Sequence, residues 1–195
     1  MYTGSPPASH STGSALICSP IRKRSWCRGY YGTRIYARAP TRFGGPFQLL
    51  IRAPEICEHA AKLGENLRWG TSLPDRLSEL AIITTARFWR AQFEWFAHAP
   101  LAEKAGVPAG AIEAIRRGET PSFAQKDEAL VHRICTELFK TQRLSDASFA
   151  EAVASLGEAG LIEVIGIIGY YTLIGNTLNV FQVALPEGVS APFPE

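Results

Sequence analysis

From residue 54 onward, apolar side chains recur at intervals of three or four positions, the spacing that places them on one face of a helix. The first such segment, residues 54–67, carries four of them: Ile56, Ala60, Leu63 and Leu67. Further helical segments follow at residues 74–84, 87–106, 107–118, 122–142, 145–156 and 161–181. No segment alternates polar and apolar residues over enough positions to predict a strand. The sequence therefore predicts an all-α domain with no significant sheet.

Local signals mark where several of these helices begin and end. Ser72 and Asp75 have the spacing of a capping box, with aspartate in place of glutamate. Ser145 is expected to cap the next-to-last helix and Gly157 to end it. Pro100 lies inside its predicted helix and has no amide proton to donate, so we expect a kink there.

The last predicted helix, residues 161–181, is apolar around most of its circumference. Its apolar content is typical of a membrane span, but Glu163, two tyrosines, two asparagines and three glycines interrupt it. A helix that is apolar nearly all round is more often buried in a core or at a subunit interface. We interpret the segment as core and oligomer contact, with no membrane, and Gly166 and Gly169 as points where another helix approaches closely.

The charges are distributed unevenly along the chain. Eight of the 20 lysines and arginines lie in residues 1–54, which contain no aspartate or glutamate. The remaining 12 basic residues stand against 18 acidic ones, so residues 55–195 carry a net charge of about −6. An acidic body argues against a nucleic-acid-binding domain, and no nucleic-acid partner is expected.

Residues 1–42 form an extension rich in Arg, Ser and Gly that shows neither helical nor strand periodicity, and we expect it to be disordered. An acid-poor, Arg-containing start is also typical of a mitochondrial transit peptide, although no amphipathic helix supports that reading. We expect a cytoplasmic protein, with mitochondrial import as the lesser alternative. The helical domain is expected over residues 43–185, followed by a C-terminal tail at 186–195.

The four cysteines show no metal-binding or disulfide pattern. None of them forms a Cys-x-x-Cys pair, and their spacings match no zinc module: Cys18, Cys27, Cys57 and Cys135. Cys57 and Cys135 fall within predicted helices, where we expect small buried apolar residues in a reducing compartment.

Candidate chemistry gathers around residues 79–98. Glu94 and His98 are four positions apart and so share one helix face, among the apolar side chains of Phe93, Trp95 and Phe96. Charge placed in apolar surroundings is costly unless it is paired or functional. Glu79, fifteen residues before Glu94, falls on or beside the apolar stripe of the preceding helix. The ordinary alternative is a structural Glu–His hydrogen bond with no chemistry attached.

Five short motifs occur in order along residues 43–185. They are Gly45-Pro46-Phe47, Trp69-Gly70-Thr71-Ser72-Leu73-Pro74, Leu77-Ser78-Glu79-Leu80-Ala81-Ile82, Glu94-Trp95-x-x-His98 and Gly169-Tyr170-Tyr171. Together they resemble the carboxymuconolactone decarboxylase family, which shares its helical fold with the alkylhydroperoxidase-D-like proteins. The resemblance implies an alkylhydroperoxidase-D-like helical bundle that assembles as a trimer or hexamer.

The peroxidase branch of that family has a Glu, then eleven residues, then Cys-x-x-Cys-x-x-x-His. Glu79 and His98 fit this pattern, but Ala91 and Glu94 occupy the two cysteine positions. Reduction of a peroxide needs one thiolate to attack it and a second thiol to resolve the product. Alkylhydroperoxidase or peroxiredoxin-type activity is therefore disfavoured.

The decarboxylase branch uses carboxylate and imidazole groups without a cofactor. The resemblance therefore implies a cofactor-free lyase whose substrate is a small cyclic carboxylate or lactone. His98 would act as general acid or stabilise the enolate, Glu94 would orient the imidazole or share its proton, and Glu79 would influence the protonation of both. Apolar pocket walls are expected from four aromatic residues: Phe88, Trp89, Phe93 and Trp95.

Two other roles for the same three residues remain open. Glu79, Glu94 and His98 are possible ligands for a divalent ion, but dinuclear helical bundles use several acids and Glu-x-x-His, whereas this chain has one Glu-x-x-x-His. We therefore expect no metal and no cofactor. A buried polar network within a non-catalytic, oligomeric binding module would use the same three residues.

Overall fold

The computed structural model describes residues 45–194, and within this range the chain forms helices and connecting segments without any strand. The helices are α2 (Phe47–Leu50), α3 (Pro54–Trp69), α4 (Asp75–Phe88), α5 (Gln92–Ala105), α6 (Ala109–Arg117), α7 (Lys126–Thr141) and α8 (Asp146–Val180). The predicted all-α fold is confirmed. The extension expected at 1–42, with Cys18 and Cys27, lies outside the described residues.

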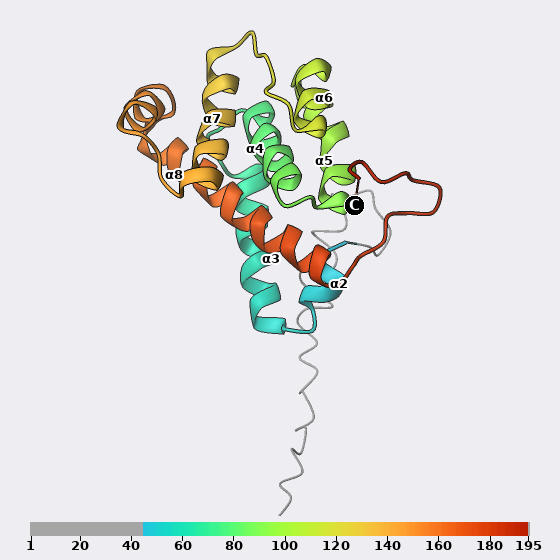
Figure 1. The fold of residues 1–195 in the computed structure, drawn as a ribbon. Coiled ribbons are helices and arrows are strands. Elements are labelled where there is room, and N and C mark those ends of the chain that lie inside the picture. Colours follow the sequence, from blue (N-terminus) through green and yellow to red (C-terminus); the bar gives the residue numbers. More distant parts are fainter. Residues whose placement is uncertain (1–44, 195) are drawn as a thin grey trace, which may run out of the picture.

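Helix α4 forms the centre of the bundle. It packs against α5, α7 and α8 along its length and also meets α3 and α6 (Figure 1). Nine of its 14 residues are buried, and Leu80, Ala81 and Ile83 have no exposed surface at all. A helix buried on nearly every side can hold a charged residue only where another side chain compensates the charge. Glu79 on this helix is such a residue.

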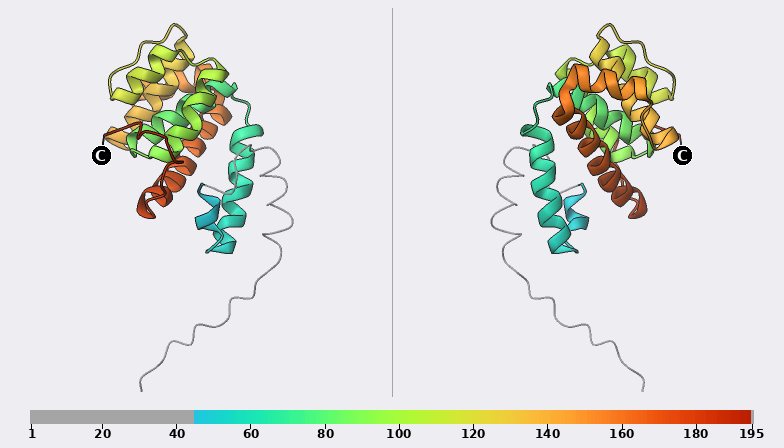
Figure 2. Two further views of the ribbon diagram at one scale, coloured as in Figure 1. Left: turned by 90° about the vertical axis from the view of Figure 1, so that its right-hand side faces the viewer. Right: turned by 90° about the vertical axis from the view of Figure 1, so that its left-hand side faces the viewer.

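Helix α8 consists of two parts that meet at Gly157. The backbone there has φ 71° and ψ 167°, outside the helical region and accessible in practice only to glycine. The expected end of a helix at Gly157 and the expected cap at Ser145 are confirmed, because the Ser145 hydroxyl accepts a hydrogen bond from the Ser148 amide at 3.2 Å. The second part, residues 158–180, extends with α3 to one side of the molecule, away from α6 and α7 (Figure 2).

Among the described residues, α8 is the one helix long and apolar enough to cross a membrane. Helices in protein cores pass the same test of length and composition. One face of the second part of α8 does enter the core, with Val164, Ile167 and Ile174 almost wholly buried. The opposite face leaves large apolar side chains in solvent, including Ile162 and Ile165.

The segment expected as a C-terminal tail packs against the bundle. Phe193 is 2% exposed and meets the Trp95 ring edge-on, with centroids 5.1 Å apart. The Gln92 side chain bonds both backbone groups of Phe193, and the Arg116 guanidinium donates to the Pro192 carbonyl at 2.8 Å. Through Pro192 and Phe193, the C-terminal segment therefore closes the end of the core beside α5 and α6, while residues 186–188 before them are exposed.

Three predictions about local structure were wrong, and two of them concern where helices begin and end. The helix expected at 87–106 is interrupted, because α4 ends at Phe88 and α5 begins at Gln92, with Arg90 at φ 51° between them. Ser72 does not form a capping box with Asp75. Its amide and hydroxyl instead donate to the Glu163 carboxylate at 2.9 to 3.1 Å, which ties the α3–α4 connection to α8.

The buried face of α3 is also rotated from the one that was expected. Ala60 and Leu67 are buried as expected, but Ile56 and Leu63 are 55% and 48% exposed. The other buried residues of this helix are small ones: Cys57, Ala61 and Gly64. Small residues occupy this face because α8 approaches closely. A Cβ added at Gly64 would lie 2.3 Å from the Tyr170 hydroxyl oxygen. Periodicity alone does not reveal such a constraint.

The burial expected for the two helical cysteines is confirmed, because Cys57 and Cys135 are both buried. Burial raises the pKa of the Cys135 thiol to about 12, so it stays protonated and unreactive at neutral pH.

The expected ends of α5 and α6 are confirmed, because Gly106 and Gly118 end these helices in the left-handed conformation. Helix α7 buries Leu130 and Ile134 as expected, but it begins at Lys126, four residues later than predicted. Pro100 lies within α5, which continues to Ala105, and the kink expected there stays a prediction.

Candidate active site

The three candidate residues meet at the interface of α4 and α5. Nδ1 of His98 lies 2.8 Å from a carboxylate oxygen of Glu79, and Nε2 lies 3.5 Å from a carboxylate oxygen of Glu94. The imidazole is therefore placed between two carboxylates, one on each ring nitrogen. Glu94 is 3% and His98 6% exposed, so this part of the cluster is almost wholly removed from water.

The turn between the two helices produces this arrangement. The positive φ of Arg90 reverses the chain at residues 89–91, and the Ala91 amide bonds the Ala86 carbonyl at 2.8 Å. The reversal packs α5 against α4, which brings Glu79 and His98 into contact although they are nineteen residues apart. Glu94 and His98 share a face because they are one turn apart on α5. The proximity that sequence spacing predicted for Glu79, Glu94 and His98 is present.

Sequence reasoning missed Arg68 as a member of this cluster. Its guanidinium lies 3.9 Å from the Glu79 carboxylate and 5.0 Å from the centroid of the Trp69 ring. Arg68 comes from the last turn of α3, so its position depends on how α3 packs against α4. The only sequence signal was its place directly before the Trp69-Gly70 motif, and that spacing says nothing about a contact with Glu79.

Two tyrosines of α8 cover the cluster. The Tyr171 ring meets the His98 ring edge-on, with centroids 5.0 Å apart, and Tyr170 packs edge-on against Tyr171 at 5.2 Å. Both are buried, and burial raises the pKa of each phenol well above its ordinary value. The phenols therefore remain neutral at physiological pH and supply an apolar wall around the imidazole.

The pKa of Glu94 is raised, chiefly because the carboxyl group is buried. The nearby charge of Glu79 acts in the same direction, while His98 and Arg68 oppose the shift with smaller effects. Burial penalises the ionised carboxylate, so the protonated form of Glu94 persists to higher pH than it would in water. A buried carboxyl group of this kind can hold a proton and pass it to the adjacent imidazole.

A cavity of about 340 Å³ opens beside Glu79, between the end of α3, the start of α4 and the end of α5. Its lining residues are Arg68, Trp69, Asp75, Ser78, Glu79, Ile82, Leu101, Lys104 and Ala105. Of the three candidate residues, Glu79 alone lines this cavity, with Glu94 and His98 behind it. The lining is mixed in charge, with Arg68 and Lys104 beside Asp75 and Glu79, so an anionic group on a ligand would make its contacts with Arg68 or Lys104.

The aromatic residues expected to form the pocket walls lie elsewhere. Phe88 stacks on Phe139 at the α7 side, with ring centroids 4.1 Å apart. Trp89 donates through its indole nitrogen to the Thr172 hydroxyl at 2.9 Å, and Trp95 packs on Phe193. None of the four lines the cavity at Glu79, where the aromatic side chain is Trp69 instead.

Within residues 45–194, no group of three or more His, Cys, Asp or Glu side chains is arranged to hold a metal ion. At the Glu79–Glu94–His98 cluster, both imidazole nitrogens already face carboxylates, so a metal would have to displace one of them. His59 and His132 line other hollows of the surface, and His10 lies outside the described residues.

Comparison with known proteins adds no family assignment. No protein-family model matches the chain, and no curated protein matches it either.

Proposed function

We propose that this chain is a carboxymuconolactone decarboxylase-like, cofactor-free lyase that acts on a small cyclic carboxylate or lactone. The observation that carries the proposal is the His98 imidazole held between two carboxylates, one of which lines a cavity that also holds Arg68 and Lys104. Such an arrangement joins a site for an anionic substrate to a chain of proton-transferring groups. The motif resemblance in the sequence supports the same reaction class.

The cationic side chains would bind the substrate and stabilise the charge that develops on it. In the proposed step, the bond between the carboxylate carbon and the ring breaks, carbon dioxide leaves, and the electron pair enters the conjugated lactone as a dienolate. Arg68 and Lys104 stabilise this negative charge from the cavity wall, where apolar neighbours strengthen the interaction.

The dienolate must then gain a proton on carbon. Glu79, at the cavity wall, passes this proton to the substrate carbon as it takes one from Nδ1 of His98, 2.8 Å away. Nε2 of His98 in turn takes a proton from Glu94, whose protonated form is favoured by burial. Water returns one proton to Glu94 after each turnover, which balances the proton that the product keeps. Glu79 is the catalytic residue in this scheme, while His98 and Glu94 act through it.

The test is the release of carbon dioxide from a panel of carboxymuconolactones by the purified full-length protein. We expect release by the wild type, and its loss in Glu79→Gln and His98→Ala proteins that keep a helical circular dichroism spectrum. Glu103→Gln, an exposed change on α5 outside the cavity, is the matched control and should release carbon dioxide at the wild-type rate. Full release by folded Glu79→Gln protein would refute the scheme. If folded wild-type protein releases no carbon dioxide, this substrate class is excluded.

Peroxide reduction by the same fold has less support. The positions that would carry the two thiols hold Ala91, which is fully buried at the start of α5, and Glu94. Neither buried thiol of the described range, Cys57 or Cys135, is part of the Glu79–Glu94–His98 cluster.

We also propose that the protein associates with copies of itself through α8 and α3, as a trimer or hexamer. The second part of α8 exposes Ile162 and Val180 at 67% and 76%, and Ile56 of α3 is 55% exposed. Between these helices lies a mostly apolar hollow of about 530 Å³ that includes Leu63 and Leu173. Exposed apolar surface of this kind is typical of an interface between subunits.

Light scattering on a gel-filtration column measures the assembly directly. Ile162→Glu places a charge on the exposed face of α8 and should convert the oligomer to monomer without unfolding it. Ile162→Ala is the milder control, expected to weaken assembly less. A wild-type protein that elutes as a monomer at all accessible concentrations would contradict the proposal.

A further inference from the structure

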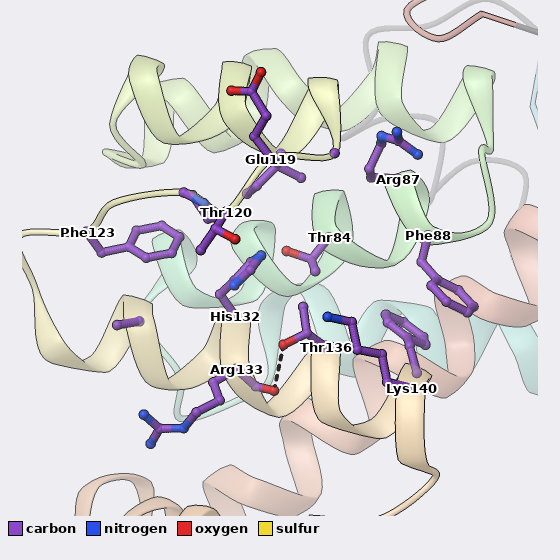
Figure 3. A pocket seen from close by; sticks show the side chains of 15 residues that line it. Thr84, Arg87, Phe88, Glu119, Thr120, Phe123, His132, Arg133, Thr136 and Lys140 are labelled. Atoms are coloured by element: carbon purple, nitrogen blue, oxygen red, sulfur yellow. Dashed lines mark hydrogen bonds between the residues drawn. The ribbon is translucent and has the colours of Figure 1, made fainter.

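A second hollow lies away from the Glu79–Glu94–His98 cluster. It measures about 600 Å³ and is formed by the end of α4, the connection between α6 and α7, and one face of α7 (Figure 3). It shares no lining residue with the cavity at Glu79. A volume of this size accommodates an organic molecule of one or two rings.

His132 points into this hollow from α7, toward Thr84 and Thr120 (Figure 3). Burial and the nearby Lys140 ammonium lower its pKa to about 4, so the imidazole is neutral at physiological pH. A neutral imidazole offers one donor and one acceptor. Apart from a tilted ring contact with Phe123, it has no polar partner within the described part of the chain. Both ring nitrogens are thus available to a ligand.

Aromatic side chains form the apolar walls on either side of His132. Phe88 and Phe139 stack with ring centroids 4.1 Å apart and planes only 6° from parallel. Phe123 lies on the opposite side of the hollow (Figure 3). Flat rings prefer stacked or edge-on contacts with such walls, which favours a ligand with a planar ring.

When the charged lining residues that form ion pairs are left out, the hollow keeps a net positive charge. Arg133 points away and pairs with Glu151, while Glu119 pairs with Arg117 through two hydrogen bonds of 2.8 and 2.9 Å. Lys140 has no carboxylate partner among residues 45–194, and its ammonium points toward the middle of the hollow (Figure 3). An anionic group on the ligand would supply the missing partner.

The threonine hydroxyls give the site a further preference. Thr84 donates its hydroxyl proton to the Leu80 carbonyl at 2.7 Å, and Thr136 donates to the Arg133 carbonyl at 3.0 Å. Both threonine oxygens therefore face a ligand as acceptors only. Thr84 and Thr136 therefore cannot donate to a carboxylate, whereas Lys140 and His132 can.

We propose that this hollow is a second small-molecule site, which binds a planar aromatic carboxylate with its ring between the phenylalanines and its carboxylate on Lys140 and His132. Three features support this assignment together: the aromatic walls, the ammonium without a carboxylate partner, and an imidazole with both nitrogens available. The proposal is independent of the lyase scheme, because the two sites have no residue in common.

Binding is tested by titrating the full-length protein with 2-naphthoate while recording the imidazole resonances of its four histidines by NMR. We expect a saturable shift of the His132 signals and none at His98. Two fragments separate the parts of the recognition: 2-naphthol carries the ring without the carboxylate, and acetate carries the carboxylate without the ring. Each should bind at least tenfold more weakly than 2-naphthoate.

The matched variants are Lys140→Gln and Lys126→Gln, both on exposed lysines of α7, of which only Lys140 lines the hollow. Lys140→Gln should weaken 2-naphthoate binding about tenfold, the loss expected for one charge-assisted contact, and Lys126→Gln should leave it unchanged. The proposal is overturned if His132 shows no saturable shift or if 2-naphthol binds as tightly as 2-naphthoate. Equal affinity in the Lys140→Gln protein would also overturn it.

Discussion

The close approach of α3 and α8 can be tested at a single glycine. A Cβ added at Gly64 would lie 2.3 Å from the hydroxyl oxygen and 2.6 Å from Cζ of Tyr170, both far inside van der Waals contact. Tyr170 cannot easily move aside, because its ring is buried and packs edge-on against Tyr171. Gly64→Ala therefore forces the two helices apart rather than displacing a flexible side-chain end.

Two opposing effects set the size of the change. Overpacking a core typically costs about 2 kcal/mol, while replacing glycine by alanine inside a helix returns about 1 kcal/mol. The expected net loss in the free energy of unfolding is about 1 kcal/mol, which lowers the melting temperature of a domain of this size by about 2–4 °C.

Thermal unfolding followed by circular dichroism measures this loss. Gly110→Ala is the control, because a Cβ there meets nothing within 4 Å and should raise stability by about 0.4–1 kcal/mol. The reasoning is wrong if Gly64→Ala melts at or above the wild-type temperature, since the helix-propensity gain would then face no steric cost. Stability changes of the same sign in Gly64→Ala and Gly110→Ala would also show that the reasoning is wrong.

Three further predictions concern the core residue Phe193, the non-helical backbone at Gly157 and the buried carboxyl group of Glu94. Phe193→Ala should lower the free energy of unfolding, measured by chemical denaturation, by about 3–5 kcal/mol. Phe149→Ala, at a residue 53% exposed, should lower it by under about 0.5 kcal/mol. Equal losses would show that the C-terminal segment is not part of the core. Gly157→Ala should cost about 1–3 kcal/mol from backbone strain alone, since its Cβ would meet no neighbour; an unchanged urea midpoint would contradict the observed conformation. Because burial raises the folded pKa of Glu94, ionisation of this group opposes folding as pH rises above its unfolded pKa of about 4, so the stability of Glu94→Gln relative to wild type should increase as pH rises from there. Melting curves recorded from about pH 4 upward check the sign, and a difference that shrinks with rising pH would refute it.

Much of the local structure was predictable because its causes lie within a few residues. Ser145 and Gly157 mark the ends of one helix through their own capping and backbone preferences. Glu94 and His98 share a helix face by spacing alone, and apolar periodicity identified most of the helical segments. The interruption at Arg90 was missed, since no glycine or proline marks the break and a positive φ at arginine has no sequence signal.

Three residues of the candidate site could be named from the sequence, but Arg68 and the geometry of the cluster could not. The sequence alone identified the all-α class and named Glu79, Glu94 and His98, because helix formation and i,i+4 proximity are local properties. Only the tertiary structure shows that Arg68 lies beside Glu79. It also shows that Glu79 is the one candidate residue of the three on the cavity wall, and that the four aromatic residues expected there do not line the cavity. It also inserted Phe193 into the core. These features depend on how separate helices pack, which is decided by long-range side-chain complementarity that no local pattern records.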